Sequence, residues 1–378
     1  MEKINLFVRR SVSLGLILFF MMPVLNAADL TQEIKNLHTS LSEIAKTLES
    51  LADTLGKVGE QLEPKKTIDL GTEKVYFADD NLVGRVELTG GKNCTSLDLS
   101  KRKLTEITIP KELVKLQELC LNDNQLTKIT IPRELVELQS LHLFGNQLTE
   151  ITIPKELINL QYLYLNGNKL TEITIPKELI NLQELYLFGN QLTKITIPKE
   201  LINLKELYLN DNKLTEITIR KELINLQSLH RLDLSDNQLT KITIPKELVE
   251  LQELYLNDNQ LTEITIPREL VMLQELYLNN NELTKITIPE GLVSLQTLRL
   301  FSNQLKKITI PKELVSLQKL NLSENKLTEI TIPEGLVKLQ SLDLSNNPDL
   351  TKEQIVIPSK LELHDDNNFI FTKKASED

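Results

Sequence analysis

The chain has 378 residues, a length that exceeds what a single hydrophobic core usually supports. This length predicts either two domains or one elongated array. Hydrophobic residues make up 40% and aromatic residues 4%, with no Trp, which excludes disorder throughout and indicates an aliphatic core. A net charge of -10 argues against non-specific binding to nucleic acid or an anionic bilayer, and two cysteines exclude a disulfide-rich scaffold.

Residues 1–27 predict a secretory signal peptide. Three basic residues precede an apolar run from Ser11 to Leu25, and Ala27 and Ala28 offer small residues for cleavage. The alternative is an uncleaved membrane anchor, but this run at 1.5 Å per residue falls short of a bilayer core of about 30 Å. We therefore expect an exported chain, secreted, periplasmic or on the cell surface, with no stable membrane span after cleavage.

Residues 28–66 predict a coiled-coil helix, because apolar residues recur there at alternating steps of four and three. The flanking positions lack the charge pairs of a simple dimer, which favours three or more helices or an antiparallel packing. The alternative is one amphipathic helix folded over the end of the array. The residues predicted to mediate oligomerisation are Ile34, Leu37, Leu41, Ile44, Leu48, Leu51 and Leu55.

Residues 67–93 predict a linker and an N-terminal cap. Short alternating runs such as the one at residues 74–77 are typical of β-strands. The pair Gly90-Gly91 marks the turn into the next segment.

Residues 94–350 repeat one sequence unit. Its Asn recurs every 22 residues, except for a 25-residue step between Asn212 and Asn237, and Arg102 takes its place in a first, degenerate copy. The count is twelve repeats. The recurring asparagines are Asn124, Asn146, Asn168, Asn190, Asn212, Asn237, Asn259, Asn281, Asn303, Asn325 and Asn347.

The spacing L-x-x-L-x-L-x-x-N-x-L within each unit is the leucine-rich-repeat signature. It predicts a solenoid of about twelve 22-residue repeats, with a parallel β-sheet on the concave face, preceded by the coiled-coil helix. The leucines point inward, and the Asn amide binds free backbone groups of the turn, so that an asparagine ladder runs along the coil. The Ile-Thr-Ile run that follows predicts a second extended segment.

Side chains between the inward leucines predict a protein-binding surface on the concave face, because the aromatic residues of the array all lie there. The alternative is that the tyrosines were copied by duplication and stabilise the sheet. Glutamates on the same face favour a basic partner or cations, unless they form a solvated edge. The predicted binding residues are Phe144, Tyr162, Tyr164, Tyr186, Phe188, Tyr208, Arg231, Tyr255, Tyr277, Arg299 and Phe301.

Motifs of enzyme chemistry are absent from the sequence. The four histidines are scattered, and there is no HExxH, GxSxG or phosphate-binding loop. Cys94 takes an inward position and Cys120 a concave one, too far apart for a disulfide. Residues 351–378 predict a C-terminal cap and polar tail. We therefore predict no catalytic residue, no metal site and no cofactor.

The repeat Leu-Gln-x-Leu-x-Leu-x-x-Asn-Gln-Leu-Thr-x-Ile, followed by Pro-x-Glu-Leu, resembles the leucine-rich-repeat proteins of pathogenic spirochaetes such as Leptospira. The 22-residue step and Ile-Thr-Ile-Pro depart from the 23-residue unit usual there. The resemblance implies an exported protein that binds host molecules, as an adhesin or virulence factor. The sorting motif of wall-anchored internalins and the C-terminal Cys domain of effector ubiquitin ligases are missing from this sequence.

The sequence thus predicts an exported, non-enzymatic scaffold that recognises a protein partner, host or envelope, on its concave face. Self-association through the N-terminal helix would raise its avidity. The alternative is a structural envelope protein, in which the coiled coil anchors the chain and the array is a spacer. A hydrolase or ligase with an unrecognised site is the third interpretation.

Overall fold

A computed structural model describes residues 35–36, 39–40, 43, 46–47, 66–69, 84–89, 91–218, 229–365 and 369–373. The chain divides into two compact units, Met1–Pro64 and Lys65–Asp378. The predicted signal peptide and the apolar heptad residues lie outside the described residues. The seven described residues of the first unit, which lie between those heptad residues, are helical and exposed. Among the described residues, no helix has the length and apolar character needed to cross a membrane.

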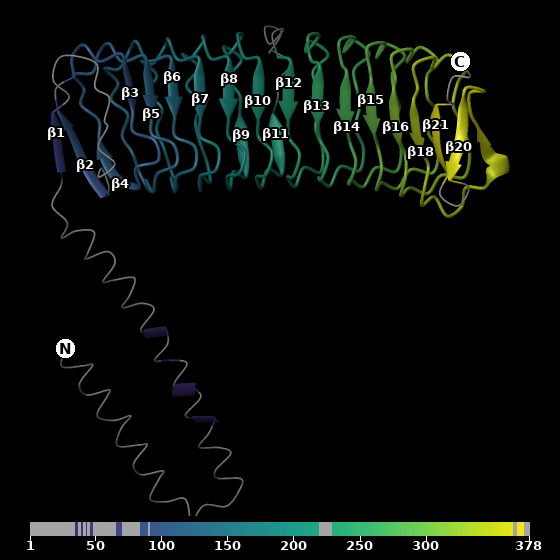
Figure 1. Ribbon diagram of the computed structural model, residues 1–378, viewed down its shortest axis with the longest axis horizontal. Helices are drawn as coiled ribbons and strands as arrows, with labels where there is room; N and C mark the ends of the chain where they lie inside the picture. Colours follow the sequence, from purple (N-terminus) through teal and green to yellow (C-terminus); the bar gives the residue numbers. More distant parts are fainter. Residues whose placement is uncertain are drawn as a thin grey trace, which may run out of the picture. The chain divides into compact units, whose positions relative to one another are not determined.

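The second unit is a solenoid of about twelve turns, as predicted. Twelve short parallel strands stand side by side in one 14-stranded sheet, in chain order from β3 to β18 (Figure 1). They are β3 (Ser96–Asp98), β5 (Glu118–Cys120), β6 (Ser140–His142), β7 (Tyr162–Tyr164), β8 (Glu184–Tyr186), β10 (Glu206–Tyr208), β12 (Arg231–Asp233), β13 (Glu253–Tyr255), β14 (Glu275–Tyr277), β15 (Thr297–Arg299), β16 (Lys319–Asn321) and β18 (Ser341–Asp343).

Every pair of neighbouring turns is aligned in the same register. The middle leucine of each strand pairs with the middle leucine of the next, as Leu185 does with Leu207, and these leucines are buried. The 25-residue step keeps this register, since Glu206 pairs with Arg231 across it. Its three extra residues fall near residues 219–228, outside the described residues. The core is therefore one continuous aliphatic column along the array.

The second extended segment forms paired strands in only part of the array. β1 (Lys66–Asp69), β2 (Gly84–Thr89) and β4 (Leu104–Thr108) make a parallel sheet. Further along, β9 (Lys194–Thr196) pairs with β11 (Glu216–Thr218), and β17 (Ile330–Thr331) pairs with β19 (Ile355–Val356). Between β4 and β9 the Ile-Thr-Ile runs stay unpaired and line an open groove of about 1020 Å³.

The far end of the sheet is closed by an antiparallel hairpin. After a short 3-10 helix, η1 (Lys352–Gln354), the strands β20 (Leu361–Asp365) and β21 (Ile370–Lys373) pair with each other, and β21 also pairs with β18. Phe371 stands opposite Leu342 and is buried. The hairpin thus covers the edge of the last parallel strand.

The asparagine ladder is confirmed, because all eleven asparagines are buried. The carbonyl oxygen of each accepts the N–H of a leucine in the turn before, at 2.9–3.0 Å. The amide nitrogen donates to backbone carbonyls of its own turn and of the turn before, as Asn190 does to Leu187 and Leu165. Each asparagine therefore joins two turns and satisfies backbone groups that no strand reaches.

The residue before each ladder asparagine adopts a left-handed backbone conformation. Its φ lies between 52° and 65° in all eleven repeats. Glycine fills the position three times, and Asp or Asn fills it six times, in keeping with the residues that tolerate this conformation. Ser302 and Glu324 adopt the same left-handed conformation, although Ser and Glu are not among the residue types that tolerate it well.

We expect Gly167→Ala to lower the free energy of unfolding by about 1 kcal/mol, because an L-residue pays a steric cost in the left-handed region. The added Cβ would not clash with the neighbouring turn, since it would lie 3.5 Å from the nearest backbone atom, the Gly145 nitrogen. Urea denaturation measures the loss. The reverse change, Glu324→Gly, should raise stability, and equal midpoints for both variants and the wild type would contradict the explanation.

Candidate functional site

The first and third side chains of each of the twelve parallel strands point away from the core. We call the surface that they form the sheet face. Third positions carry the residues between the two inward leucines, and most of these side chains are half-buried by their neighbours in the adjacent turns. In chain order they are Asp98, Cys120, His142, Tyr164, Tyr186, Tyr208, Asp233, Tyr255, Tyr277, Arg299, Asn321 and Asp343.

A continuous row of rings covers the sheet face from β6 to β10. The ring centroids of His142 and Tyr164 lie 4.9 Å apart, those of Tyr164 and Tyr186 4.7 Å, and those of Tyr186 and Tyr208 4.5 Å. Three rings flank this row at 6.4–6.5 Å from their nearest neighbours. The larger aromatic cluster comprises His142, Phe144, Tyr162, Tyr164, Tyr186, Phe188 and Tyr208. Tilted and edge-on contacts at these distances favour a fixed arrangement of the rings.

Arg231 and Asp233 on β12 separate this cluster from a smaller one. The Arg231 guanidinium lies 5.6 Å from the Tyr208 ring centroid, donates to the Tyr208 hydroxyl and forms an ion pair with Glu253. In the smaller aromatic cluster, the rings of Tyr255 and Tyr277 lie 4.7 Å apart, and the guanidinium of Arg299 lies over Tyr277 at 4.4 Å. Each cluster therefore ends on an arginine.

The hydroxyls of three tyrosines donate hydrogen bonds to the glutamate at the first position of the next strand. Tyr164 donates to Glu184 at 2.6 Å and Tyr186 donates to Glu206 at 2.7 Å. The Tyr255 hydroxyl lies 2.7 Å from a carboxylate oxygen of both Glu253 and Glu275. Burial and these carboxylates raise the pKa of Tyr164, Tyr186 and Tyr255. The tyrosines therefore stay neutral, and the glutamates hold their rings in place.

The structure brings the predicted binding residues together on one sheet face. Nine are in contact through rings or guanidinium groups, in the two clusters and at Arg231 and Arg299. Phe144 joins the larger cluster through His142. Phe301 lies on the same face, and within the described part of the chain it makes no ring contact with the others.

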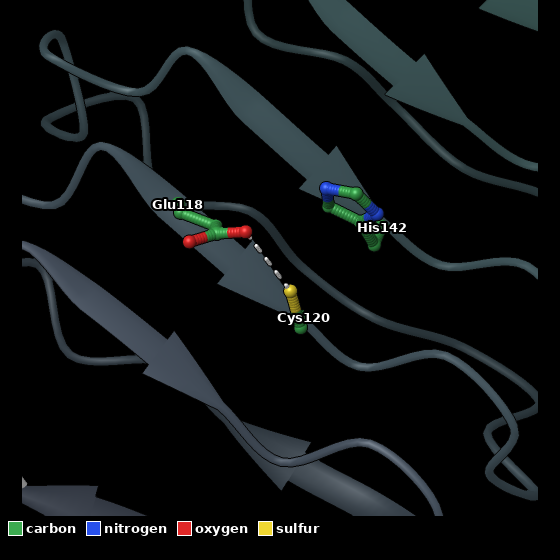
Figure 2. A group of neighbouring side chains, drawn as sticks. All are labelled: Glu118, Cys120 and His142. Carbon is green, nitrogen blue, oxygen red and sulfur yellow. Dashed lines mark hydrogen bonds between the residues drawn. The ribbon is translucent and has the colours of Figure 1, made fainter.

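The sequence prediction missed a group of three different ligand-bearing side chains at the start of this face. Glu118, Cys120 and His142 lie together on β5 and β6 (Figure 2). The signal was available in the repeat alignment. Consecutive third positions read Asp98, Cys120 and His142, where five later repeats have tyrosine.

The prediction also missed a row of exposed aliphatic residues on the turns. Within the repeats, the residue after the Pro-x-x-Leu turn is Val or Ile, and in nine repeats its exposed fraction is between 37% and 66%. The charged residues beside this position dominate the sequence pattern of the turns and obscure it. The aliphatic row comprises Val114, Val136, Ile158, Ile180, Ile202, Val271, Val293, Val315 and Val337.

Comparison with known proteins identifies the repeat type. The family described as "BspA type Leucine rich repeat region" matches residues 98–191, 184–304, 234–351 and 274–376, in six copies. No curated protein matches the chain.

Among solved structures, the functional domain of internalin InlJ from Listeria monocytogenes is 24% identical to this chain, with a TM-score of 0.61. The match covers 68% of this chain and 55% of the InlJ chain. The chain thus spans about half of that structure. Internalin InlF from the same organism is 29% identical, with a TM-score of 0.60 over 69% and 76% of the two chains. A leucine-rich-repeat protein of Leptospira interrogans is 29% identical over 79% and 94%, with a TM-score of 0.47. The fold is therefore shared with bacterial leucine-rich-repeat proteins of Listeria, and the likeness is not confined to spirochaete proteins.

Proposed function

Because this chain belongs to the BspA-type leucine-rich-repeat family, we propose that it is an exported scaffold whose sheet face binds a protein, and that this partner is a host surface protein. Repeat solenoids use extended, rigid faces of this kind to bind partners. The proposed contact residues are the two aromatic clusters, with Arg231, Arg299 and Phe301. The role is one of binding, without catalysis.

The continuous aromatic row carries the proposal. Tyrosine offers a large contact area at a small entropic cost, and tyrosine and arginine are enriched among the residues that dominate binding energies. The contacts between rings and the hydroxyl–carboxylate bonds hold these side chains before a partner arrives. A surface ordered in advance loses little conformational entropy on binding.

Export and self-association complete the proposal, and both depend on residues outside the described part of the chain. A signal peptide at residues 1–27 would deliver the protein beyond the cytoplasm. The heptad at residues 28–66 would gather several arrays, and so raise avidity for a partner displayed on a surface.

A structural role in the envelope, with the array as a spacer, is the second candidate. The tyrosine–glutamate bonds favour it, because a ladder whose hydroxyls are already satisfied stabilises the sheet without any partner. In that case an envelope component would be bound through another part of the chain.

Capture from two protein sources distinguishes these functions. The protein serves as bait for host-cell surface proteins and for bacterial envelope extract, beside the triple variant Tyr164→Ala, Tyr186→Ala, Tyr208→Ala. We expect a host protein to bind, and the triple variant to bind it about 100-fold more weakly, as for the loss of hot-spot residues. Affinities are measured by surface plasmon resonance after confirming that the variant keeps its thermal melting temperature.

A matched control changes the same three repeats on their turns. The variant Ile158→Ala, Ile180→Ala, Ile202→Ala removes exposed aliphatic side chains and leaves the sheet face intact. It should bind as the wild type does. If this variant loses the partner and the tyrosine variant keeps it, the binding surface is the aliphatic row. Retention of an envelope protein by both variants would support the spacer role.

A further inference from the structure

Three side chains with different donor atoms converge at the start of the sheet face. Glu118 and Cys120 lie on β5 and His142 lies on β6, directly beside Cys120 in the strand register. One ligand atom from each, a carboxylate oxygen, the thiol sulfur and an imidazole nitrogen, lies within 4.8 Å of the other two (Figure 2). The parallel strands fix the three Cα positions before any ligand arrives.

The existing contacts of the three side chains leave metal-binding capacity free. The Cys120 thiol donates a long hydrogen bond of 3.7 Å to Glu118 Oε1, and Ser96 Oγ lies 3.1 Å from Glu118 Oε2. Neither ring nitrogen of His142 makes a hydrogen bond to any residue in the described segments. Its ring contacts are edge-on to Tyr164 and to Phe144, which orient the imidazole without engaging its nitrogens.

The residue types at this site differ from those of the other repeats, and each of them can ligate a metal ion. Five of the twelve third positions are tyrosine, whereas the first three are Asp98, Cys120 and His142. The whole chain has only two cysteines and four histidines, and one of each stands here in adjacent turns. Asp98 pairs with Cys120 from the strand on the other side, β3, and so adds a second carboxylate to the row.

We propose that Glu118, Cys120 and His142 bind one Zn²⁺ ion, with Asp98 or a water molecule at the fourth position. Thiolate sulfur, imidazole nitrogen and carboxylate oxygen are the donors that zinc takes in tetrahedral sites, usually with three or four protein ligands. The mixture of donors disfavours Ca²⁺ and Mg²⁺, which take oxygen ligands. This site does not depend on the proposed protein-binding function.

Two carboxylates, those of Glu118 and Asp98, lie near the thiol and would attract a cation. On binding, a zinc–sulfur bond forms, the S–H bond breaks and its proton passes to the buffer.

Titration of the metal-free, full-length protein tests the site. We expect calorimetry with Zn²⁺ to give one ion per chain, and proton release in buffers of different ionisation enthalpy. Co²⁺ should give the near-ultraviolet charge-transfer band of a thiolate ligand. Cys120→Ser should abolish the band and the thiol's proton release. Glu118→Gln, Cys120→Ser and His142→Gln should each weaken Zn²⁺ binding at least about tenfold. These side chains are exposed or half-buried, so folding is checked by circular dichroism.

Matched controls use the same residue types elsewhere in the array. Glu184→Gln changes the glutamate three repeats further on, His230→Gln changes a histidine outside the cluster, and Cys94→Ala removes the other thiol. All three should keep the wild-type affinity and the cobalt band. Absence of zinc binding, unchanged affinity in folded Cys120→Ser, or loss of the band in folded Cys94→Ala would each overturn the proposal.

Discussion

Replacing Asn190 by Leu is expected to lower the free energy of unfolding by about 3–5 kcal/mol. The side chain is buried, its carbonyl oxygen accepts the Leu170 N–H at 3.0 Å, and its amide donates to the carbonyls of Leu165 and Leu187 at 3.0 and 2.9 Å. Leucine has a similar size but removes all three bonds. The Leu170 N–H then has no partner, at a cost of about 1–3 kcal/mol, whereas the carbonyls of Leu165 and Leu187 keep the bonds from Asn168 and Asn212 and lose about 0.5–1.5 kcal/mol each. Chemical denaturation measures the loss.

Because each turn contacts only its neighbours, this damage should be local at first. Hydrogen exchange should become faster at the Leu170 amide and in the turns on either side, while distant turns keep their protection. The control is Asn181→Ala, since Asn181 is half-buried and makes one bond, at 2.9 Å, to the Ile158 carbonyl. It should cost under about 1 kcal/mol. A similar cost for both variants would mean that the ladder does not hold the turns together.

Phe371→Ala is expected to destabilise the C-terminal hairpin by about 3–4 kcal/mol, the usual cost of emptying a buried aromatic site. Phe371 is buried and pairs with Leu342 of the last parallel strand, so its loss should release β21 from β18. The freed edge of β18 and the leucines beneath it would then be exposed, and exposed strand edges promote association. Faster exchange at β21 and a concentration-dependent increase in light scattering are the expected measurements.

The matched control for the hairpin is Val356→Ala in β19, whose side chain is 56% exposed. This variant should remain monodisperse to the same extent as the wild type and keep its exchange rates. If Phe371→Ala behaves like the control, the hairpin is not what closes this end of the core.

The sequence was sufficient to predict the repeated geometry because one period governs it. The inward leucines and the asparagine ladder recur every 22 residues, so the buried positions follow from the spacing alone. The pairing of the Ile-Thr-Ile runs was not predictable in this way. Runs of the same sequence pair at β9 and β11 but not between β4 and β9 or between β11 and β17, so the sequence of a run does not decide whether it pairs.

The composition of the sheet face was predictable, and its internal contacts were not. Alternation along each strand was enough to place Tyr164, Tyr186 and Tyr208 on one surface. The hydroxyls of Tyr164 and Tyr186 donate to glutamates of the next turn, and that of Tyr208 accepts from Arg231. These contacts depend on side-chain conformations that a repeat pattern does not specify. The ligand group at Cys120 depends on the strand register, which sets His142 beside Cys120, and not on the spacing of the two cysteines along the chain.

The constant register between turns has a consequence for how the gene can change. The joint at Leu185 and Leu207 is the joint found all along the array, and the 25-residue step shows that a longer unit still meets its neighbour in register. Unequal recombination that removed or added one whole repeat would therefore bring together turns that pair in the same register as the existing turns. Copy number, and with it the reach of the aromatic surface, would be free to vary while the two ends of the sheet stayed as they are.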